Sequence, residues 1–237
     1  MTPLALLTLI AMAQPYGSLR VDASAPPDAA AGVFATIGDA VAAAAAHDTI
    51  RVAEGVYTEP TIVIDRPLTL LAEPGAILDG QGERGLIEVH ADSVTVAGFT
   101  MRDTGISFTE DRAAILVEEA RFCDVRDNTL ERTFFGIYLA NAGDCTLHRN
   151  RLEASRDRET RSGNGIHLWY STRIRIEENE ISGHRDGIYF EFVEDSQVIG
   201  NESIGNGRYG LHFMFSDRSS YDGNTFADNN AGVAVMY

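Results

Sequence analysis

The chain has 237 residues, with 19 basic residues against 35 acidic ones, for a formal net charge of -16. Such a surface repels phosphate backbones, which argues against a nucleic-acid partner. Every basic residue is arginine, so chemistry that needs a lysine nucleophile or a Schiff base is excluded.

The first residues have the pattern of an export signal. Residues 3–13 form an apolar run ending in Ala11-Met12-Ala13, the small–x–small pattern of a signal-peptidase site. The run is too short to span a bilayer, and we expect no transmembrane segment elsewhere. We therefore predict a cleaved signal peptide at 1–13, a periplasmic protein, and an N-terminal tail of little periodicity at 14–32.

A repeat starts to emerge after this tail. Ile37 to Ala46 is predicted to be a helix that caps a stack of strands, because an exposed edge would invite pairing. The segments Ile62–Ile64, Leu68–Leu70, Ile87–Val89 and Val94–Val96 alternate apolar and polar residues and are predicted strands. The stretch Asp48–Glu59 resembles the first coil of pectin-lyase-like β-helices.

Two markers then keep one period of about 22 residues, as expected of a repeat architecture. The asparagines are separated by gaps of 22, 29, 22 and 23, and the Gly–aliphatic pairs by 29, 22, 23 and 22. The long gap contains a charged insertion at 155–162. The asparagines are Asn128, Asn150, Asn179, Asn201 and Asn224, and the glycines are Gly136, Gly165, Gly187, Gly210 and Gly232.

Apolar residues alternate between the markers, for example Ile188, Phe190 and Phe192, then Leu211, Phe213 and Phe215. Short strands without intervening helices predict a right-handed parallel β-helix over 33–237, an all-β solenoid in which each coil stacks on the previous one. The asparagines should form an amide ladder, and the glycines should supply turn conformations. Because a solenoid needs its last coil covered, we expect further coils beyond Tyr237.

The alternation also predicts which side chains face outward after each Gly–aliphatic pair. Their stacking forms one strip of external sheet, whose members are His167, Trp169, Tyr189, Glu191, His212, Met214 and Met236, with Tyr138 at one end. Thioether and imidazole groups together suit Cu(I), so His212, Met214, Met236, His167 and Glu191 are candidate ligands. Alternatively, Trp169, Tyr189 and Tyr138 belong to an apolar patch where another protein or a missing segment of the chain docks.

Other candidates have simpler interpretations. Cys123 and Cys145 are 22 residues apart, so we expect them to stack as small core residues, with a disulfide as the alternative. His148 and His184 are expected to be exposed near turns. A carbohydrate lyase, hydrolase or epimerase, or a carbohydrate-binding solenoid, is the alternative function. The outward Glu118 and Glu191 are predicted to lie three coils apart, roughly 14 Å, which is too far for a catalytic carboxylate pair.

Three motifs closely resemble the signature coils of the NosD family: Gly163–Ser171, Asp186–Phe192, and Gly210–Ser216 followed by Asn229–Tyr237. The resemblance covers about residues 33–237, and His212, Met214 and Met236 match signature positions. It implies a non-enzymatic periplasmic accessory protein that helps to build the copper–sulfide centre of nitrous oxide reductase. The implied partners are a membrane ABC transporter, a copper-chaperone lipoprotein and the reductase itself.

Overall fold

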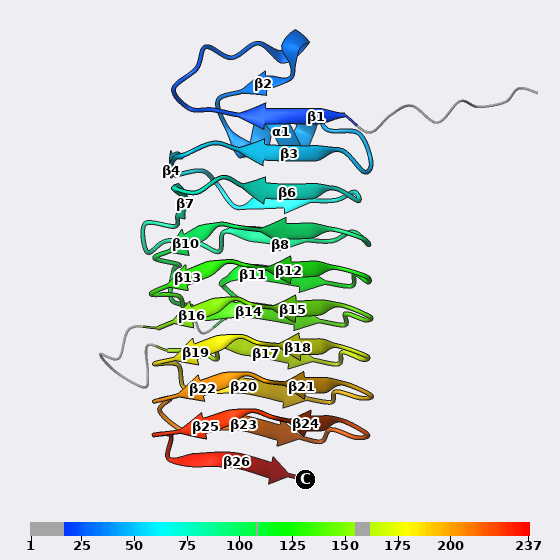
Figure 1. The fold of residues 1–237 in the computed structure, drawn as a ribbon, viewed down its shortest axis with the longest axis vertical. Helices are drawn as coiled ribbons and strands as arrows, with labels where there is room; N and C mark the ends of the chain where they lie inside the picture. The colour runs from blue at the N-terminus through cyan, green and yellow to red at the C-terminus, as the bar shows by residue number, and fades with distance from the viewer. Residues whose placement is uncertain (1–16, 108, 155–161) are drawn as a thin grey trace, which may run out of the picture.

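The computed structural model describes residues 17–107, 109–154 and 162–237. The predicted signal peptide and most of the charged insertion at 155–162 therefore lie outside the described residues. Within the described part, the chain winds as a stack of coils along one long axis (Figure 1). Each coil contributes one strand to each of three sheets, which is the arrangement of a parallel β-helix.

The three sheets are named here A, B and C. Sheet A contains β2 (Val33–Phe34), β1 (Ser18–Val21), β3 (Thr49–Val52), β6 (Thr69–Ala72), β9 (Thr95–Ala97), β12 (Asp124–Arg126), β15 (Thr146–His148), β18 (Arg175–Glu177), β21 (Gln197–Ile199) and β24 (Ser220–Asp222). Sheet B contains β4 (Gly55–Tyr57), β7 (Ala76–Asp79), β10 (Thr100–Arg102), β13 (Thr129–Glu131), β16 (Arg151–Glu153), β19 (Glu180–Ser182), β22 (Glu202–Ile204) and β25 (Thr225–Ala227).

Sheet C carries the candidate site and contains β5 (Ile62–Ile64), β8 (Ile87–Val89), β11 (Ala113–Glu118), β14 (Phe135–Ala140), β17 (Ile166–Trp169), β20 (Asp186–Glu191), β23 (Tyr209–Met214) and β26 (Ala231–Met236). Its neighbouring strands are parallel, with Ile188 opposite Leu211 and Phe190 opposite Phe213. These inward side chains join one continuous core. The predicted fold is therefore confirmed, including the pairing of residues one coil apart.

The N-terminal end is closed by α1 (Ile37–Ala43), three residues shorter than predicted. Thr36 caps the helix by accepting a hydrogen bond from the Asp39 N–H, and the Glu59 carboxylate accepts from Ile37 and Gly38. The helix packs against β1, β2, β3 and β5. Strand β1 lies within the segment expected as a tail, so the sheet structure begins at Ser18 rather than near residue 33.

The five repeated asparagines stack inside the solenoid as a continuous ladder. The Asn179 Nδ2 donates to Asn201 Oδ1 at 2.9 Å, and Asn150 Nδ2 donates to Asn179 Oδ1 at 3.0 Å. Each amide also caps main-chain groups of adjoining coils, as Asn179 Nδ2 does with the Leu147 carbonyl. The ladder thereby satisfies main-chain groups that the turn between sheets A and B leaves unpaired.

The repeated glycines do not have the role expected from the sequence. Gly187 is not among the residues with positive φ; instead, a Cβ on it would lie 2.8 Å from the Gly210 carbonyl oxygen of the next coil. Gly136, Gly165, Gly187 and Gly210 require glycine because the main chain of the next coil approaches closely there, whereas Gly232 has no such close neighbour. The left-handed turn positions are occupied largely by other residues, including Asp127, Arg149 and Glu178 just before the ladder asparagines.

Candidate functional site

Two columns of side chains run along the outer face of sheet C, in the register that the sequence predicts. The first pairs Tyr138, His167, Tyr189, His212 and Ala234, and the second pairs Ala140, Trp169, Glu191, Met214 and Met236. The strip residues of successive coils are therefore immediate neighbours. This brings His212, Met214 and Met236 together on β23 and β26.

His212 is oriented by a buried carboxylate. Its Nδ1 lies 3.3 Å from Asp186 Oδ2, and the Arg208 Nε lies 3.9 Å from Asp186 Oδ1. A carboxylate accepts, so in the neutral imidazole Nδ1 carries the proton and Nε2 carries the lone pair. His212 Nε2 is buried without a hydrogen-bond partner among the described residues. Asp186 is the partner that sequence reasoning missed, and it fixes the tautomer that a metal ligand needs.

His212 is nevertheless not the accessible side chain that its outward position suggests. It is only 1% exposed, because the rings of Tyr189 and Tyr209 contact it edge-on, each with a centroid separation of 4.8 Å. An ion reaching Nε2 from solvent must therefore displace one of these rings. Met214 and Met236, which are both half-buried, lie beside this covered imidazole.

Tyr189 joins the two columns. Its hydroxyl lies 3.2 Å from Glu191 Oε2 and also 3.2 Å from Met214 Sδ. Burial, followed by the nearby Glu191 charge, raises the pKa of Tyr189 to about 12, so the phenol stays protonated at neutral pH. Glu191, a predicted ligand, is thus engaged with a phenol.

His167 lies apart from the His212 group. Its strand β17 is two strands from β23, with Tyr189 between the two rings, so their main chains are roughly 10 Å apart. Asn164 Nδ2 lies 3.3 Å from His167 Nδ1, and His167 Nε2 has no partner among the described residues. Burial, together with the Arg185 charge, lowers the pKa of His167 to about 3. In this arrangement the Tyr189 ring separates the two imidazoles, so they do not face a common position for one ion.

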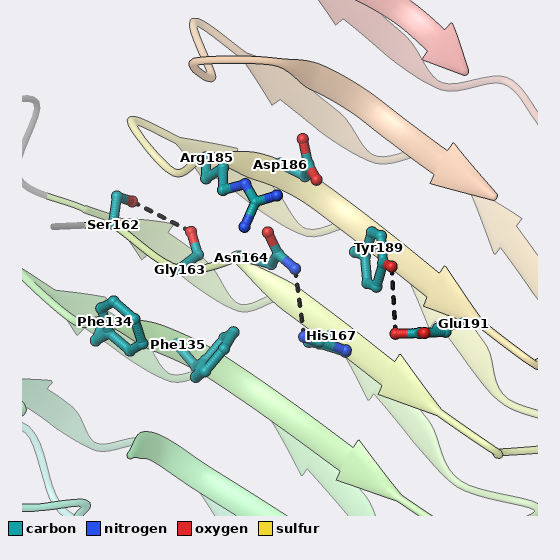
Figure 2. Close-up of a pocket in the computed structure, with 10 residues that line it drawn as sticks. All are labelled: Phe134, Phe135, Ser162, Gly163, Asn164, His167, Arg185, Asp186, Tyr189 and Glu191. Carbon is teal, nitrogen blue, oxygen red and sulfur yellow. Dashed lines mark hydrogen bonds between the residues drawn. The ribbon is translucent and has the colours of Figure 1, made fainter. Parts of the chain in front are cut away.

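A cleft of about 560 Å³ opens beside His167. Figure 2 shows Phe134 and Phe135 on one side and Arg185 and Asp186 on the other, with Asn164 and His167 between them. The same view shows Tyr189 and Glu191 at one end of the cleft. The cleft therefore includes His167, Tyr189 and Glu191 of the strip but neither Met214 nor Met236.

The docking residues need one correction. Tyr138 is 6% exposed, because its ring stacks on His167 at 4.4 Å and contacts Phe135 at 5.3 Å. More accessible aromatic side chains lie at the turn that follows sheet C. Three rings there form a stacked ladder: Tyr170, Phe192 and Phe215.

The sequence pattern placed Phe192 and Phe215 in inward alternation, but β20 and β23 end before them. All three ladder residues adopt positive φ, at 47°, 55° and 48°, which turns their side chains outward. Tyr170 and Phe215 are each 51% exposed. A bulky residue rarely adopts this conformation, so neither hydrophobic patterning nor turn composition indicates it.

The cysteines lie in the core, as the sequence predicts. Both thiols are free and buried, and the Cys123 N–H donates to Cys145 Sγ at 3.4 Å. The hydrogen bond with Cys123, followed by burial, raises the pKa of Cys145, which disfavours a thiolate ligand. His184, expected to be exposed, is 1% exposed because its turn folds inward, and its N–H donates to Asn206 Oδ1.

Metal sites can also be made of imidazole, thiolate and carboxylate ligands. The described residues contain no group of three or more His, Cys, Asp or Glu side chains placed to hold a metal ion. Glu118 and Glu191 are separated by the strands carrying Ala140 and Trp169, as predicted, so they do not form a carboxylate pair across one bond. No helix in the described part of the chain is long and apolar enough to cross a membrane.

Comparison with known proteins places this geometry in a family. The model of the right-handed β-helix region matches residues 113–237, more than half of the chain. The chain belongs to this family. It is also similar to two curated proteins, each named "Probable ABC transporter binding protein NosD". The one from Pseudomonas aeruginosa is 39% identical over 129 residues, covering 53% of this chain. The one from Stutzerimonas stutzeri is 29% identical over 139 residues, covering 58% of this chain.

The aligned regions span about a third of the two relatives, 30% and 32% of their lengths. Among solved structures, an alginate lyase from Paenibacillus aligns with a TM-score of 0.66 at 14% identity, covering 79% of this chain and 72% of that one. A pectate lyase aligns with a TM-score of 0.55 at 12% identity, covering 94% and 68%. At such identities these likenesses concern the fold alone. The chain is therefore a right-handed β-helix protein that is similar to the two proteins named NosD over part of their length.

Proposed function

We propose that the chain is a periplasmic accessory protein for assembly of the copper–sulfide centre of nitrous oxide reductase, and that sheet C receives Cu(I) as cargo. The observation that carries the proposal is the environment of the His212 imidazole. Asp186 lies beside its Nδ1, and the buried Nε2 has no hydrogen-bond partner among the described residues. Met214 and Met236 stand beside it on adjacent strands.

The donor set fits a soft monovalent ion. Two thioethers and one neutral imidazole match Cu(I). Zn²⁺ prefers imidazole, thiolate and carboxylate ligands, and Mg²⁺ prefers oxygen ligands. The three residues are His212, Met214 and Met236, and Asp186 orients the imidazole from behind. Because copper is passed on rather than retained, a site with few ligands suits the task. His167 belongs to the neighbouring cleft and not to this ligand set.

Transfer also needs a docking surface, and the aromatic ladder supplies one. Tyr170, Phe192 and Phe215 stand at the strand ends directly after Trp169, Glu191 and Met214. An exposed apolar ladder next to the ligands would position a partner that carries copper. The proposed partners are a copper-chaperone lipoprotein, a membrane ABC transporter and the reductase.

A Cu(I) titration of the protein under anaerobic conditions, against a competing chromophoric chelator, tests the cargo site. We expect binding that is lost when His212, Met214 and Met236 are replaced together by Asn, Leu and Leu. His148→Asn is the matched control, because His148 lies on sheet A and pairs with Asp124 instead. Equal binding by the parent protein and the triple variant would refute this site.

The docking step is tested separately. Phe215→Ser should slow copper transfer from the loaded lipoprotein while leaving the Cu(I) affinity of the isolated chain unchanged. Phe122→Ser is the matched control, since Phe122 is also an exposed phenylalanine with positive φ, at 60% exposure, but lies outside the ladder. If both variants slow transfer equally, the ladder is not the docking surface.

A further inference from the structure

Tyr189 occupies the centre of the strip and contacts four of its members, His167, His212, Glu191 and Met214. Its ring meets His167 and His212 edge-on, each with a centroid separation of 4.8 Å. Its hydroxyl is within 3.2 Å of both Glu191 Oε2 and Met214 Sδ. A half-buried tyrosine with these neighbours influences which groups can reach an ion at His212.

The hydroxyl has a single proton to share between two acceptors. A carboxylate is a much stronger acceptor than a thioether, so the proton points to Glu191. The thioether lone pairs of Met214 are then left free. At the same time, the hydrogen bond holds the Glu191 carboxylate on the phenol rather than beside the imidazole.

Glu191 would otherwise be a ligand. It lies opposite Met214 and diagonal to His212 across adjacent strands, a separation that a long side chain can bridge. An oxygen ligand added to His212 Nε2 would favour harder divalent ions such as Zn²⁺ over Cu(I). A Glu191 carboxylate released from Tyr189 would therefore add an oxygen ligand to the thioether and imidazole ligands, and the site would no longer favour Cu(I) alone.

We propose that Tyr189 determines the metal specificity of this face by holding Glu191 out of the coordination sphere of His212 and Met214. The role rests on the proposed function, because it presumes that Cu(I) binds at His212, Met214 and Met236. Tyr189 is a positioning residue, since it acts on the ion through the carboxylate that it holds. Glu191, grouped with the ligands on sequence grounds, has the opposite role in this arrangement.

The test compares Zn²⁺ and Cu(I) binding for the parent protein, Tyr189→Phe, Glu191→Gln and the double variant. Phenylalanine keeps every ring contact and removes one oxygen, so the fold should be retained, which thermal melting checks. We expect Tyr189→Phe to bind Zn²⁺ about tenfold more tightly, with Cu(I) affinity changed less than about threefold. Adding Glu191→Gln should return Zn²⁺ binding to the parent level, because the released carboxylate is then gone.

Tyr209→Phe is the matched control, because its ring makes the same edge contact with His212 without touching the bond between Tyr189 and Glu191. If the parent protein binds Cu(I) but Tyr189→Phe binds Zn²⁺ no more tightly than the parent does, only the specificity role of Tyr189 is overturned. A gain in Zn²⁺ binding that persists in the double variant also overturns that role alone. A parent protein that binds no Cu(I) overturns the proposed function and this role together.

Discussion

Replacing Asn179 by leucine should destabilise the middle of the solenoid more than any surface change. Asn179 is fully buried, and its side chain makes four hydrogen bonds. The oxygen accepts from the main-chain and side-chain N–H groups of Asn150, and the amide donates to Asn201 and to the Leu147 carbonyl. Leucine fills a similar volume but offers none of these groups, so the loss is one of hydrogen bonding rather than packing.

Three groups lose a partner in this variant. They are the Asn150 N–H, one hydrogen of the Asn150 amide and the Leu147 carbonyl, whereas Asn201 Oδ1 still accepts from the main-chain N–H of residue 179. The Leu147 carbonyl keeps its place in the parallel ladder between β15 and β18, so at about 1–2 kcal/mol for each unsatisfied buried group the two Asn150 groups cost about 2–4 kcal/mol. Guanidinium unfolding measures it, with exposed Asn230→Ala as the control expected within about 0.5 kcal/mol of the parent. A loss below about 1 kcal/mol for Asn179→Leu would show that the ladder is not what holds the coils together.

Three further outcomes are expected. Burial lowers the pKa of His184 to about 3. In the unfolded chain this histidine binds a proton below about pH 6.5, whereas in the folded protein it stays neutral until about pH 3. The free energy of unfolding therefore falls as the pH drops from about 6.5 towards 3. At pH 5 the loss from this residue is about 2 kcal/mol, and His184→Asn should remove it in paired pH-melting curves, while His148→Asn should not. Gly187→Ala should prevent folding of the coil, visible as lost circular dichroism or insolubility, because a Cβ would collide with the next coil. Replacing Met214 and Met236 together by leucine should leave the melting temperature nearly unchanged but abolish maturation of the reductase in cells.

The register of sheet C could be predicted from the sequence because a coil repeat constrains it twice. The asparagine ladder and the Gly–aliphatic pairs share one period, so strands one coil apart must align, as Glu191 does with Met214. The conformations of the turns could not be predicted in this way. In a parallel β-helix, neighbouring coils select turn geometry, so Asp127 and Arg149 adopt left-handed conformations that local propensity assigns to glycine.

The two outward columns could likewise be predicted from the sequence, but the environment of each candidate ligand could not. Alternation says that His212 and Tyr138 leave the sheet outward; it does not say that other side chains cover them. Asp186 and Tyr209 occupy the first positions of their strands, where they pair with each other and contact His212 of the first column. Such contacts depend on rotamers outside the sheet, which a period of two does not determine.

The geometry of the proposed site is set by coil length as much as by residue type. Met214 and Met236 are neighbours because the coil between them returns the chain in register, with Leu211 opposite Val233 and Phe213 opposite Val235. A coil longer or shorter by one residue within β26 would turn Met236 to the core and an apolar residue to the surface. An insertion in a turn would leave the ligands in place, as the longer coil between Asn150 and Asn179 does for the pairing of Leu152 with Ile181. The proposed Cu(I) site therefore requires strands of fixed length. The turns can change in length without moving the proposed ligands, and such changes can alter the contacts with partner proteins.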